Sequence, residues 1–328
     1  MTRPSACYGL NGQILGISAE GPELWRDFDR MLASLRIAGP IEPDFRLDII
    51  ETEALDEAPD GSPVFDGEIP EDGYCRMIED GGTVHLVFPE RQTVAINGEE
   101  GWAQIRIRPN AKAAWTPSML VLDAALDAGG QHMLHTAGLT LPEHDDVVLI
   151  HAPSGTGKTT TSLALATHGF GLCSDDAMIL DAAATRPVAW GLPRHVKIHQ
   201  KTARMIPQVS PCLGPSWDRN GEQAVSLERL SEIVRIESPA ARPVAALLHL
   251  ARSVDSQTRL VPMARTDAMV ALAMDNVRTG MTGLLPLQKR RLATIAGLVS
   301  SVPTFRLEVG ARPADAAALI SDTLRARD

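Results

Sequence analysis

Residues 147–169, VVLIHAPSGTGKTTTSLALATHG, restrict the folds open to this chain more than any other segment. Their apolar start predicts a buried strand, the glycine-rich middle predicts a tight loop, and the stretch from Lys158 to about His168 predicts a helix that ends at Gly169. The loop fits the Walker A pattern, with Ala152 at the position of the usual first glycine. A strand, a loop of this kind and a helix in this order are typical of nucleotide-binding α/β domains.

Each position of this loop has a physical reason in phosphate binding. Glycines let the backbone N–H groups turn inward, and the N-terminus of the following helix directs its positive end at the same anion. Lys158 would neutralise charge between the β- and γ-phosphates, and the Thr159 hydroxyl would ligate Mg²⁺. The alternative, a glycine-rich turn that binds nothing, is disfavoured by the flanking strand and helix. We therefore predict ATP and Mg²⁺ as ligands, with nucleotide contacts from Ser154, Gly155, Thr156, Gly157, Lys158, Thr159 and Thr160.

Two adjacent acids, Asp175 and Asp176, follow Lys158 by 17 and 18 residues, directly after an apolar strand segment. In an α/β sheet this position is the carboxyl end of a strand, beside the loop. Phosphoryl transfer needs one carboxylate to hold Mg²⁺ and another to accept the proton of the attacking hydroxyl. Two like charges a few ångströms apart acquire different proton affinities, so an Asp pair can divide these tasks. An Asp-Asp turn that caps a strand is the alternative.

Four segments together resemble one family: LHTAGL (134–139), APSGTGKTT (152–160), GFGLCSDDAMIL (169–180) and GLPRHVKI (191–198). They look like the catalytic domain of HPr kinase/phosphorylase, and more closely like its stand-alone relatives, the HPr-kinase-like (Hpr-related) kinases. The resemblance covers roughly residues 118–325. It implies an α/β fold with a P-loop nucleotide-binding core of the HPr kinase C-terminal, or PEP-carboxykinase, type.

The resemblance also implies a role for each matching side chain. Lys158 and Thr159 would bind nucleotide phosphate and Mg²⁺. Asp175 would be the catalytic base, and Asp176 would be the second metal ligand beside Thr159. His135 in the LHTAG segment matches a family histidine that lies near the base. The predicted catalytic residues are thus Asp175, His135 and Lys158, and the predicted metal ligands are Thr159 and Asp176.

Several other polar residues are open to interpretation. His132 is a weaker candidate for the upstream histidine. Arg194 and Lys197 belong to a compact basic run, which either contacts substrate or phosphate or is a solvated loop. Arg252 ends the apolar stretch VAALLHLAR and could reach the nucleotide from a strand end. His249 within the same stretch is expected to be a core histidine.

These residues predict a phosphotransferase that moves the γ-phosphoryl group of ATP to a hydroxyl acceptor. The resemblance allows a serine of a protein, a serine of a biosynthetic precursor peptide, or a small metabolite. HPr enzymes that also act as phosphorylases have a Glu-Arg-Gly-Leu-Gly-like signature, and nothing between residues 181 and 280 matches it. This departure favours a specialised peptide or small molecule. The alternatives are a P-loop NTPase and a nucleotide-sensing module without an acceptor.

The distribution of charge divides the chain. Residues 1–100 contain 21 Asp and Glu against 7 Lys and Arg, a net charge of −14. Residues 101–328 contain 20 against 24, a net charge of +4. Such asymmetry indicates two modules. The prediction is a smaller, acidic α+β N-terminal domain over residues 1–115 and the HPr-kinase-like catalytic domain over residues 116–328.

Local patterns suggest how the acidic part is built. The tight-turn pair Asn11-Gly12 predicts a hairpin, and short alternating segments between residues 74 and 108 predict a small antiparallel sheet. The stretch 54–73 is rich in Asp, Glu, Pro and Gly, and is expected to be an exposed loop.

The overall net charge of −10 disfavours nucleic acid and anionic membranes as partners, because their phosphates would be repelled. No run approaches 18 apolar residues and the N-terminus lacks a secretory pattern, so a cytoplasmic location is expected. The widely spaced cysteines predict reduced thiols rather than disulfides. The resemblance leaves room for a homo-oligomer, because members of the HPr kinase family assemble into rings.

Overall fold

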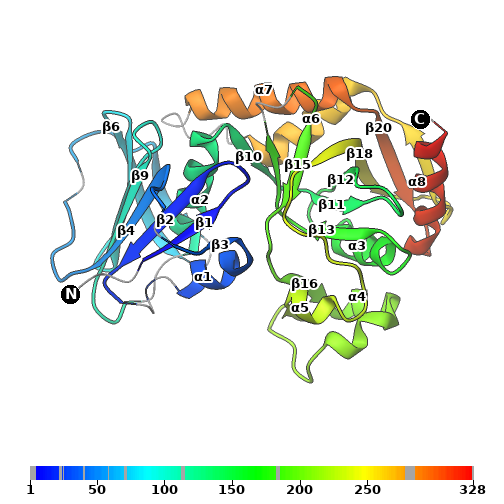
Figure 1. The fold of residues 1–328 in the computed structure, drawn as a ribbon, viewed down its shortest axis with the longest axis horizontal. Coiled ribbons are helices and arrows are strands. Elements are labelled where there is room, and N and C mark those ends of the chain that lie inside the picture. Colours follow the sequence, from blue (N-terminus) through cyan, green and yellow to red (C-terminus); the bar gives the residue numbers. More distant parts are fainter. Residues whose placement is uncertain are drawn as a thin grey trace. The chain divides into compact units, whose positions relative to one another are not determined.

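In the computed structural model the chain forms two compact units (Figure 1). The first comprises Met1–His132 with Arg278–Lys289, and the second comprises Met133–Val277 with Arg290–Asp328. Both contain large sheets and a few helices, so the chain is a mixed α/β protein. The structure describes residues 5–21, 24, 26–39, 41–57, 59–69, 72–111, 115–181, 185–277 and 285–326.

The first unit is built on a sheet that has nine strands among its described residues. Its elements are β1 (Ser5–Gly9), β2 (Ile14–Ala19), α1 (Arg26–Leu32), the 3₁₀ helix η2 (Ala33–Leu35), β3 (Arg36–Ile37), β4 (Phe45–Glu51), β5 (Phe65–Ile69), β6 (Gly73–Asp80), β7 (Thr83–Phe88), β8 (Gln92–Asn97), β9 (Trp102–Ile107) and α2 (Trp115–Ala128). The strand order is β3-β1-β2-β4-β9-β8-β7-β6-β5. The predicted hairpin is confirmed, since β1 and β2 pair across Asn11-Gly12. The predicted antiparallel sheet between residues 74 and 108 is confirmed, since β6–β7, β7–β8 and β8–β9 are antiparallel pairs. The sheet continues beyond these strands through the parallel pairs β4–β9 and β2–β4.

The boundary between the units lies after His132, whereas the sequence predicts a domain boundary after residue 115. The reason is α2, which packs against β4 and β8 of the first unit. Its apolar residues Val121, Leu122 and Leu126 are fully buried. Composition shows where acidic residues become fewer along the chain. The core to which a helix belongs depends instead on which residues its apolar side chains pack against.

One strand of the first unit lies inside the stretch 54–73 that was expected to be a loop. β5 alternates apolar or small residues with acids (FDGEI), and it pairs antiparallel with β6 at the edge of the sheet. The Tyr74 hydroxyl of β6 donates a hydrogen bond to Asp66. Edge strands often have charged residues, because these discourage pairing with another strand on the open side. The acidic residues of β5 are therefore the reason that the sequence predicts a loop here.

The second unit has more elements, and β10 and α7 cross its boundary. They are β10 (Gln131–Leu134), β11 (Ala137–Thr140), β12 (Val147–His151), α3 (Lys158–Ala166), β13 (Gly171–Ser174), β14 (Met178–Asp181), β15 (Val188–Gly191), β16 (Val196–His199), α4 (Gln200–Met205), the 3₁₀ helix η3 (Pro207–Cys212), β17 (Glu222–Val225), α5 (Leu227–Leu230), β18 (Arg242–Arg252), β19 (Arg259–Pro262), α6 (Arg265–Asn276), α7 (Leu285–Ser301), β20 (Thr304–Val309), the 3₁₀ helix η5 (Pro313–Asp315) and α8 (Ala316–Arg325). The predicted buried strand before the loop and the helix after it are confirmed as β12 and α3.

A mixed sheet forms the centre of the second unit, in the order β10-β14-β15-β18-β12-β11-β13, with β20 beside β18 (Figure 1). β12, β18 and β20 are parallel neighbours, so their carboxyl ends meet at one edge. Every residue of β12 is buried. Val148 and Ile150 pack in a core with residues of α3 and α8, and Val147 and Leu149 pack in a core with residues of α6 and α7. Helices on both faces explain why the strand is an uninterrupted apolar run.

The cysteines are free, as the sequence predicts. Burial raises the pKa of Cys75 to about 11 and that of Cys173 to about 12, so these thiols remain protonated at neutral pH. In the described part of the chain, no helix combines the length and the apolar character needed to cross a membrane.

Candidate functional site

The connection from β12 to α3 lies at the carboxyl end of a central strand. Gly155 and Gly157 have φ angles of 75° and 113°, in the left-handed region that favours glycine. A Cβ at either position would have no atom within 4 Å, so glycine is required here by the backbone and not by lack of space. Ala152, by contrast, is fully buried in the core beside α3. A small apolar residue therefore suits the first position of the motif.

The N-terminus of α3 is open to an anion. Gly157 is the N-cap, and within the described residues the helix has no side-chain capping hydrogen bond. First-turn N–H groups and the positive end of the helix dipole are then suited to a ligand. Ser154 and Gly155 are exposed at the tip of the loop. The Thr160 hydroxyl instead bonds to the Thr202 hydroxyl at 2.7 Å and joins α3 to α4. Thr160 can therefore offer a ligand its backbone N–H.

Lys158, the first residue of α3, contacts the acidic pair, which lies in the short connection between β13 and β14. Its Nζ donates to the Asp175 carbonyl oxygen at 2.7 Å and to the Asp176 carboxylate. His135 Nε2 lies 3.3 Å from Oδ1 of Asp176. The structure thus brings four of the predicted site residues together, although they come from three separate segments of the chain.

The two acids have different surroundings. Asp175 is buried and its Oδ2 accepts a hydrogen bond from the Thr159 hydroxyl at 2.6 Å, whereas the Asp176 side chain is 45% exposed. Burial raises the pKa of Asp175, and the Lys158 charge and the Thr159 hydrogen bond oppose this. Asp175 Oδ1 has no hydrogen-bond partner among the described residues. The Ser162 hydroxyl is near, but it donates to the Lys158 carbonyl at 2.9 Å.

The buried Asp175 carboxyl predicts a stability cost that depends on pH. Because its pKa is raised in the folded state, the folded protein holds this proton more tightly than the unfolded chain does. The free energy of unfolding therefore falls as the pH rises above the ordinary Asp value of about 3.9. We expect Asp175→Asn to stabilise the protein by about 1–3 kcal/mol at neutral pH, and the gain to shrink towards pH 4. Thermal unfolding by circular dichroism measures both, and a gain independent of pH would contradict the prediction.

The predicted substrate contacts Arg194, Lys197 and Arg252 have different locations. Arg252 ends β18, and its guanidinium donates to the Gly155 carbonyl at 3.0 Å, so its positive charge lies on the loop. Lys197 is exposed on β16. The pKa of Asp218 is lowered mainly by the hydrogen bond from the Glu222 backbone N–H, and the Lys197 charge adds a smaller effect. Arg194 lies in the connection before β16. The described contacts therefore support a role at the loop for Arg252.

The sequence patterns missed a histidine pair beside the loop. His151, the last residue of β12, is buried; its Nε2 lies 2.8 Å from Asp275 Oδ2 of α6, and its Nδ1 lies 3.1 Å from His249 Nδ1 of β18. Burial lowers the pKa of both histidines, and the hydrogen bond and charge of Asp275 oppose this for His151. His249, expected in the core, is half-buried and belongs to this pair. The available signal was a histidine directly before the loop.

His132, the weaker candidate for the upstream histidine, is also accounted for. It is buried, and its Nδ1 is hydrogen-bonded to Asp127. Its ring is therefore already engaged within the first unit. His135 is the candidate that contacts an acid of the pair.

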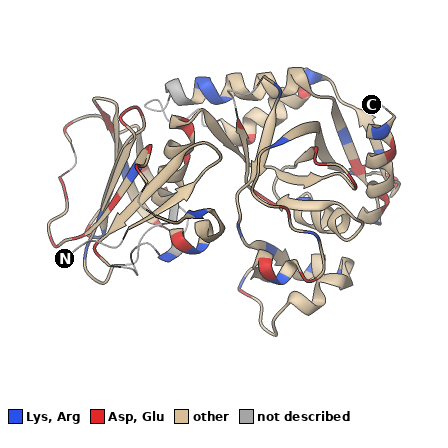
Figure 2. Cartoon of the chain, in the orientation of Figure 1, with Lys and Arg blue, Asp and Glu red and all other residues tan. Residues whose placement is uncertain are grey.

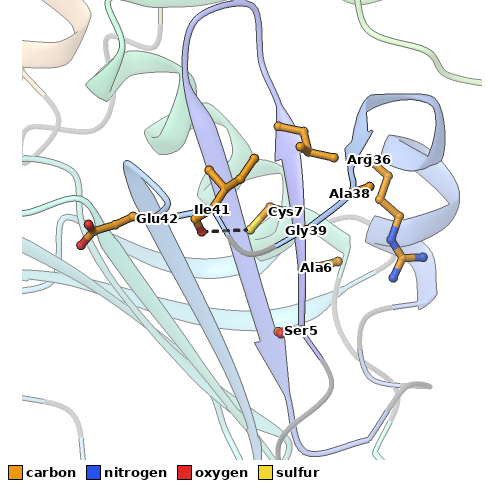
Figure 3. Close-up of a pocket in the computed structure, with 9 residues that line it drawn as sticks. Ser5, Ala6, Cys7, Arg36, Ala38, Gly39, Ile41 and Glu42 are labelled. Carbon is orange, nitrogen blue, oxygen red and sulfur yellow. Dashed lines mark hydrogen bonds between the residues drawn. The ribbon is translucent and has the colours of Figure 1, made fainter.

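Two hollows are lined by other residues. One, of about 700 Å³, lies in the first unit along β1 and the segment that follows β3 (Figure 3). There the Cys7 thiol donates to the Ile41 carbonyl at 3.7 Å, and the Arg36 guanidinium lies 3.5 Å from Asp29. The other, of about 490 Å³, lies beside β17 and α5 and includes His195. None of the predicted catalytic or metal-binding residues lines either hollow.

Two cations contact the loop region: Lys158 bonds to Asp176, and Arg252 bonds to the Gly155 carbonyl. Figure 2 shows that Lys and Arg of the second unit are spread over several helices and strands. Within the described ranges, no group of three or more His, Cys, Asp and Glu side chains could hold a metal ion. Mg²⁺ in phosphoryl-transfer sites does not need such a group, because it is held by one or two protein oxygens, water and substrate phosphates.

The geometry is a strand–loop–helix in which the Lys158 amine contacts the Asp176 carboxylate and the Thr159 hydroxyl contacts the Asp175 carboxylate. These are the groups that bind phosphate esters and assist their transfer. No family model matches the chain, and no curated protein matches it either. The function of the chain is therefore inferred from its own residues and contacts.

Proposed function

We propose that this chain is an ATP- and Mg²⁺-dependent kinase that transfers the γ-phosphoryl group to a hydroxyl. The contacts at the start of α3 support this most directly. Lys158 bonds to the Asp176 carboxylate and to the Asp175 backbone carbonyl, and the Thr159 hydroxyl bonds to the Asp175 carboxylate. A P-loop core of the HPr kinase C-terminal, or PEP-carboxykinase, type is part of the same proposal. The β12–loop–α3 unit at the centre of a mixed sheet is compatible with it.

The loop would bind the triphosphate through its backbone N–H groups and two cations. Lys158 would exchange its contact with Asp176 for the β- and γ-phosphates, which have the greater negative charge. Arg252, which contacts the Gly155 carbonyl, would add positive charge at the tip of the loop.

Thr159 and Asp175 fit a Mg²⁺ ion that accompanies the nucleotide. The Thr159 hydroxyl and Asp175 Oδ2 lie 2.6 Å apart, and Asp175 Oδ1 is buried without a hydrogen-bond partner in the described part of the chain. Hydroxyl and carboxylate oxygens are the donors that Mg²⁺ prefers. When bound, Mg²⁺ would neutralise charge on the transferred phosphoryl group.

The contacts favour a division of roles between the acids opposite to that implied by the family resemblance. Asp175 is buried against Thr159, which suits the metal side of the site. Asp176 is 45% exposed and lies beside Lys158 and His135, where an acceptor hydroxyl can reach it. We therefore assign proton acceptance to Asp176, with His135 as its neighbour.

In the transfer step, the acceptor oxygen forms a bond with the γ-phosphorus, and the bond from that phosphorus to the β–γ bridging oxygen breaks. The proton of the acceptor hydroxyl passes to Asp176, and the leaving oxygen remains on ADP. Lys158 and the loop N–H groups stabilise the charge that develops there. The acceptor class is a serine of a protein or precursor peptide, or a small hydroxylated metabolite.

Incubation of the protein with γ-³²P-labelled ATP, Mg²⁺ and two sets of acceptors, serine-containing peptides and hydroxylated metabolites, tests the proposal. We expect mass spectrometry to find an acceptor that is heavier by one phosphoryl group. Release of phosphate without such a product would indicate an NTPase. ATP binding without turnover would indicate a nucleotide-sensing module, and failure to bind ATP would refute the nucleotide site itself.

A further inference from the structure

The last turn of α6 contacts two segments of the site at once. Asp275 Oδ2 lies 2.8 Å from His151 Nε2, at the residue directly before the loop. The neighbouring Asn276 Oδ1 accepts a hydrogen bond from the His135 backbone N–H at 2.6 Å. Two consecutive residues of one helix thus hold the start of the loop and the segment that faces Asp176.

The Asn276 side chain is fixed in orientation. It is buried, and its Nδ2 donates to the Leu272 carbonyl one turn earlier at 2.8 Å. With the amide hydrogens directed at its own helix, the carbonyl oxygen faces the His135 N–H. If the amide were rotated by half a turn, its N–H groups would face the His135 backbone N–H, and two donors cannot bond to each other. The contact with His135 therefore has one arrangement.

Asp275 likewise determines which nitrogen of the His151 ring has the hydrogen. A carboxylate only accepts hydrogen bonds, so His151 Nε2 has the hydrogen and its Nδ1 is an acceptor. The partner at 3.1 Å from this Nδ1 is His249 Nδ1, which therefore donates. The imidazole of His151 is held from α6 on one side and from β18 on the other, at the point where the chain leaves β12.

We propose that Asp275 and Asn276 are positioning residues, Asp275 for the phosphate-binding loop through His151 and Asn276 for proton transfer through His135. This inference rests on the proposed kinase function. The two contacts serve different parts of the reaction, because His151 precedes the loop that binds nucleotide and His135 lies beside the exposed acid of the pair. Their removal should affect different kinetic parameters.

Steady-state kinetics of Asp275→Ala and Asn276→Ala, together with binding of a fluorescent ATP analogue, test the separation. We expect Asp275→Ala to weaken nucleotide binding about 10-fold with a smaller change in kcat, and Asn276→Ala to lower kcat on the order of 10- to 100-fold with little change in binding. Met274→Ala is the matched control, since this side chain of the same turn is 78% exposed. It should behave as the wild type.

Double variants show whether each residue acts through its histidine. His135→Ala combined with Asn276→Ala should lose no more kcat than His135→Ala alone, and His151→Gln combined with Asp275→Ala should bind nucleotide as His151→Gln does. If Asn276→Ala does not fold, Asn276→Gln, which displaces the same groups by one methylene, should show the same loss of kcat. Additive losses would mean separate structural effects and would overturn the inference.

A spectroscopic measurement without turnover separates this inference from the proposed function. Long-range ¹H–¹⁵N NMR should show His151 protonated at Nε2 in the wild type, and this preference should be lost in Asp275→Ala. An active wild type whose variants keep both nucleotide binding and kcat would overturn the inference alone. A wild type that neither binds nor turns over ATP would overturn the proposed function and the inference with it, even with the tautomer as expected.

Discussion

Lys158→Ala is expected to abolish measurable phosphoryl transfer, with a fall in kcat/KM of about 10³-fold or more. The amino group lies at the start of α3, in contact with the Asp175 carbonyl and the Asp176 carboxylate. Its removal takes away the positive charge that would neutralise the β- and γ-phosphates. The two carboxylates would then repel the nucleotide. Nucleotide binding and transfer of ³²P to the acceptor measure the two consequences separately.

Lys201→Ala is the matched control for this variant. Lys201 lies on α4 and is exposed. The substitution therefore removes the same charge from a surface position. Transfer should stay within about two-fold of the wild type, as is usual for surface substitutions. If Lys158→Ala bound and transferred phosphate as well as the control, the loop would not be a phosphate site, whatever its resemblance to Walker A.

The second large effect is expected from the acidic pair. Asp175→Asn and Asp176→Asn should each lower kcat about 10²- to 10⁴-fold, the range for loss of a general base or an equivalent transition-state contact. Their causes should differ. Because Asp175 bonds to Thr159, its replacement should raise the Mg²⁺ concentration needed for activity. Asp176→Asn should keep Mg²⁺ and nucleotide binding and lose the limb of the pH–rate profile that reports the base.

Titration of activity with Mg²⁺, and pH–rate profiles of both variants, decide between the two divisions of roles. The family resemblance implies that Asp175 is the base and Asp176 the metal ligand, which predicts the reverse pattern. Unaltered Mg²⁺ dependence in Asp175→Asn, together with increased Mg²⁺ demand in Asp176→Asn, would restore that division. Full activity in both variants would remove the pair from the chemistry.

Much of the nucleotide-binding segment could be predicted because its signals are local. Glycine at 155 and 157 reflects the left-handed backbone that each position adopts, and the apolar run of β12 reflects burial on both faces. The proximity of Lys158 to the acids also follows from a short connection through one helix and one strand. β5 and α2 show the limit of such reasoning. Acidic composition concealed β5, which is an edge strand, and composition does not reveal that α2 packs against β4 and β8.

The sequence by itself determined the strand, loop and helix that would hold a phosphate, because backbone conformation and periodic burial are recorded in neighbouring residues. Only the tertiary structure decided which acid is buried against Thr159 and which is left beside His135. It also decided that His151 meets His249 and Asp275, which are about a hundred residues away in the chain. Parallel strand pairing and helix packing set these contacts, and both depend on the arrangement of the whole unit.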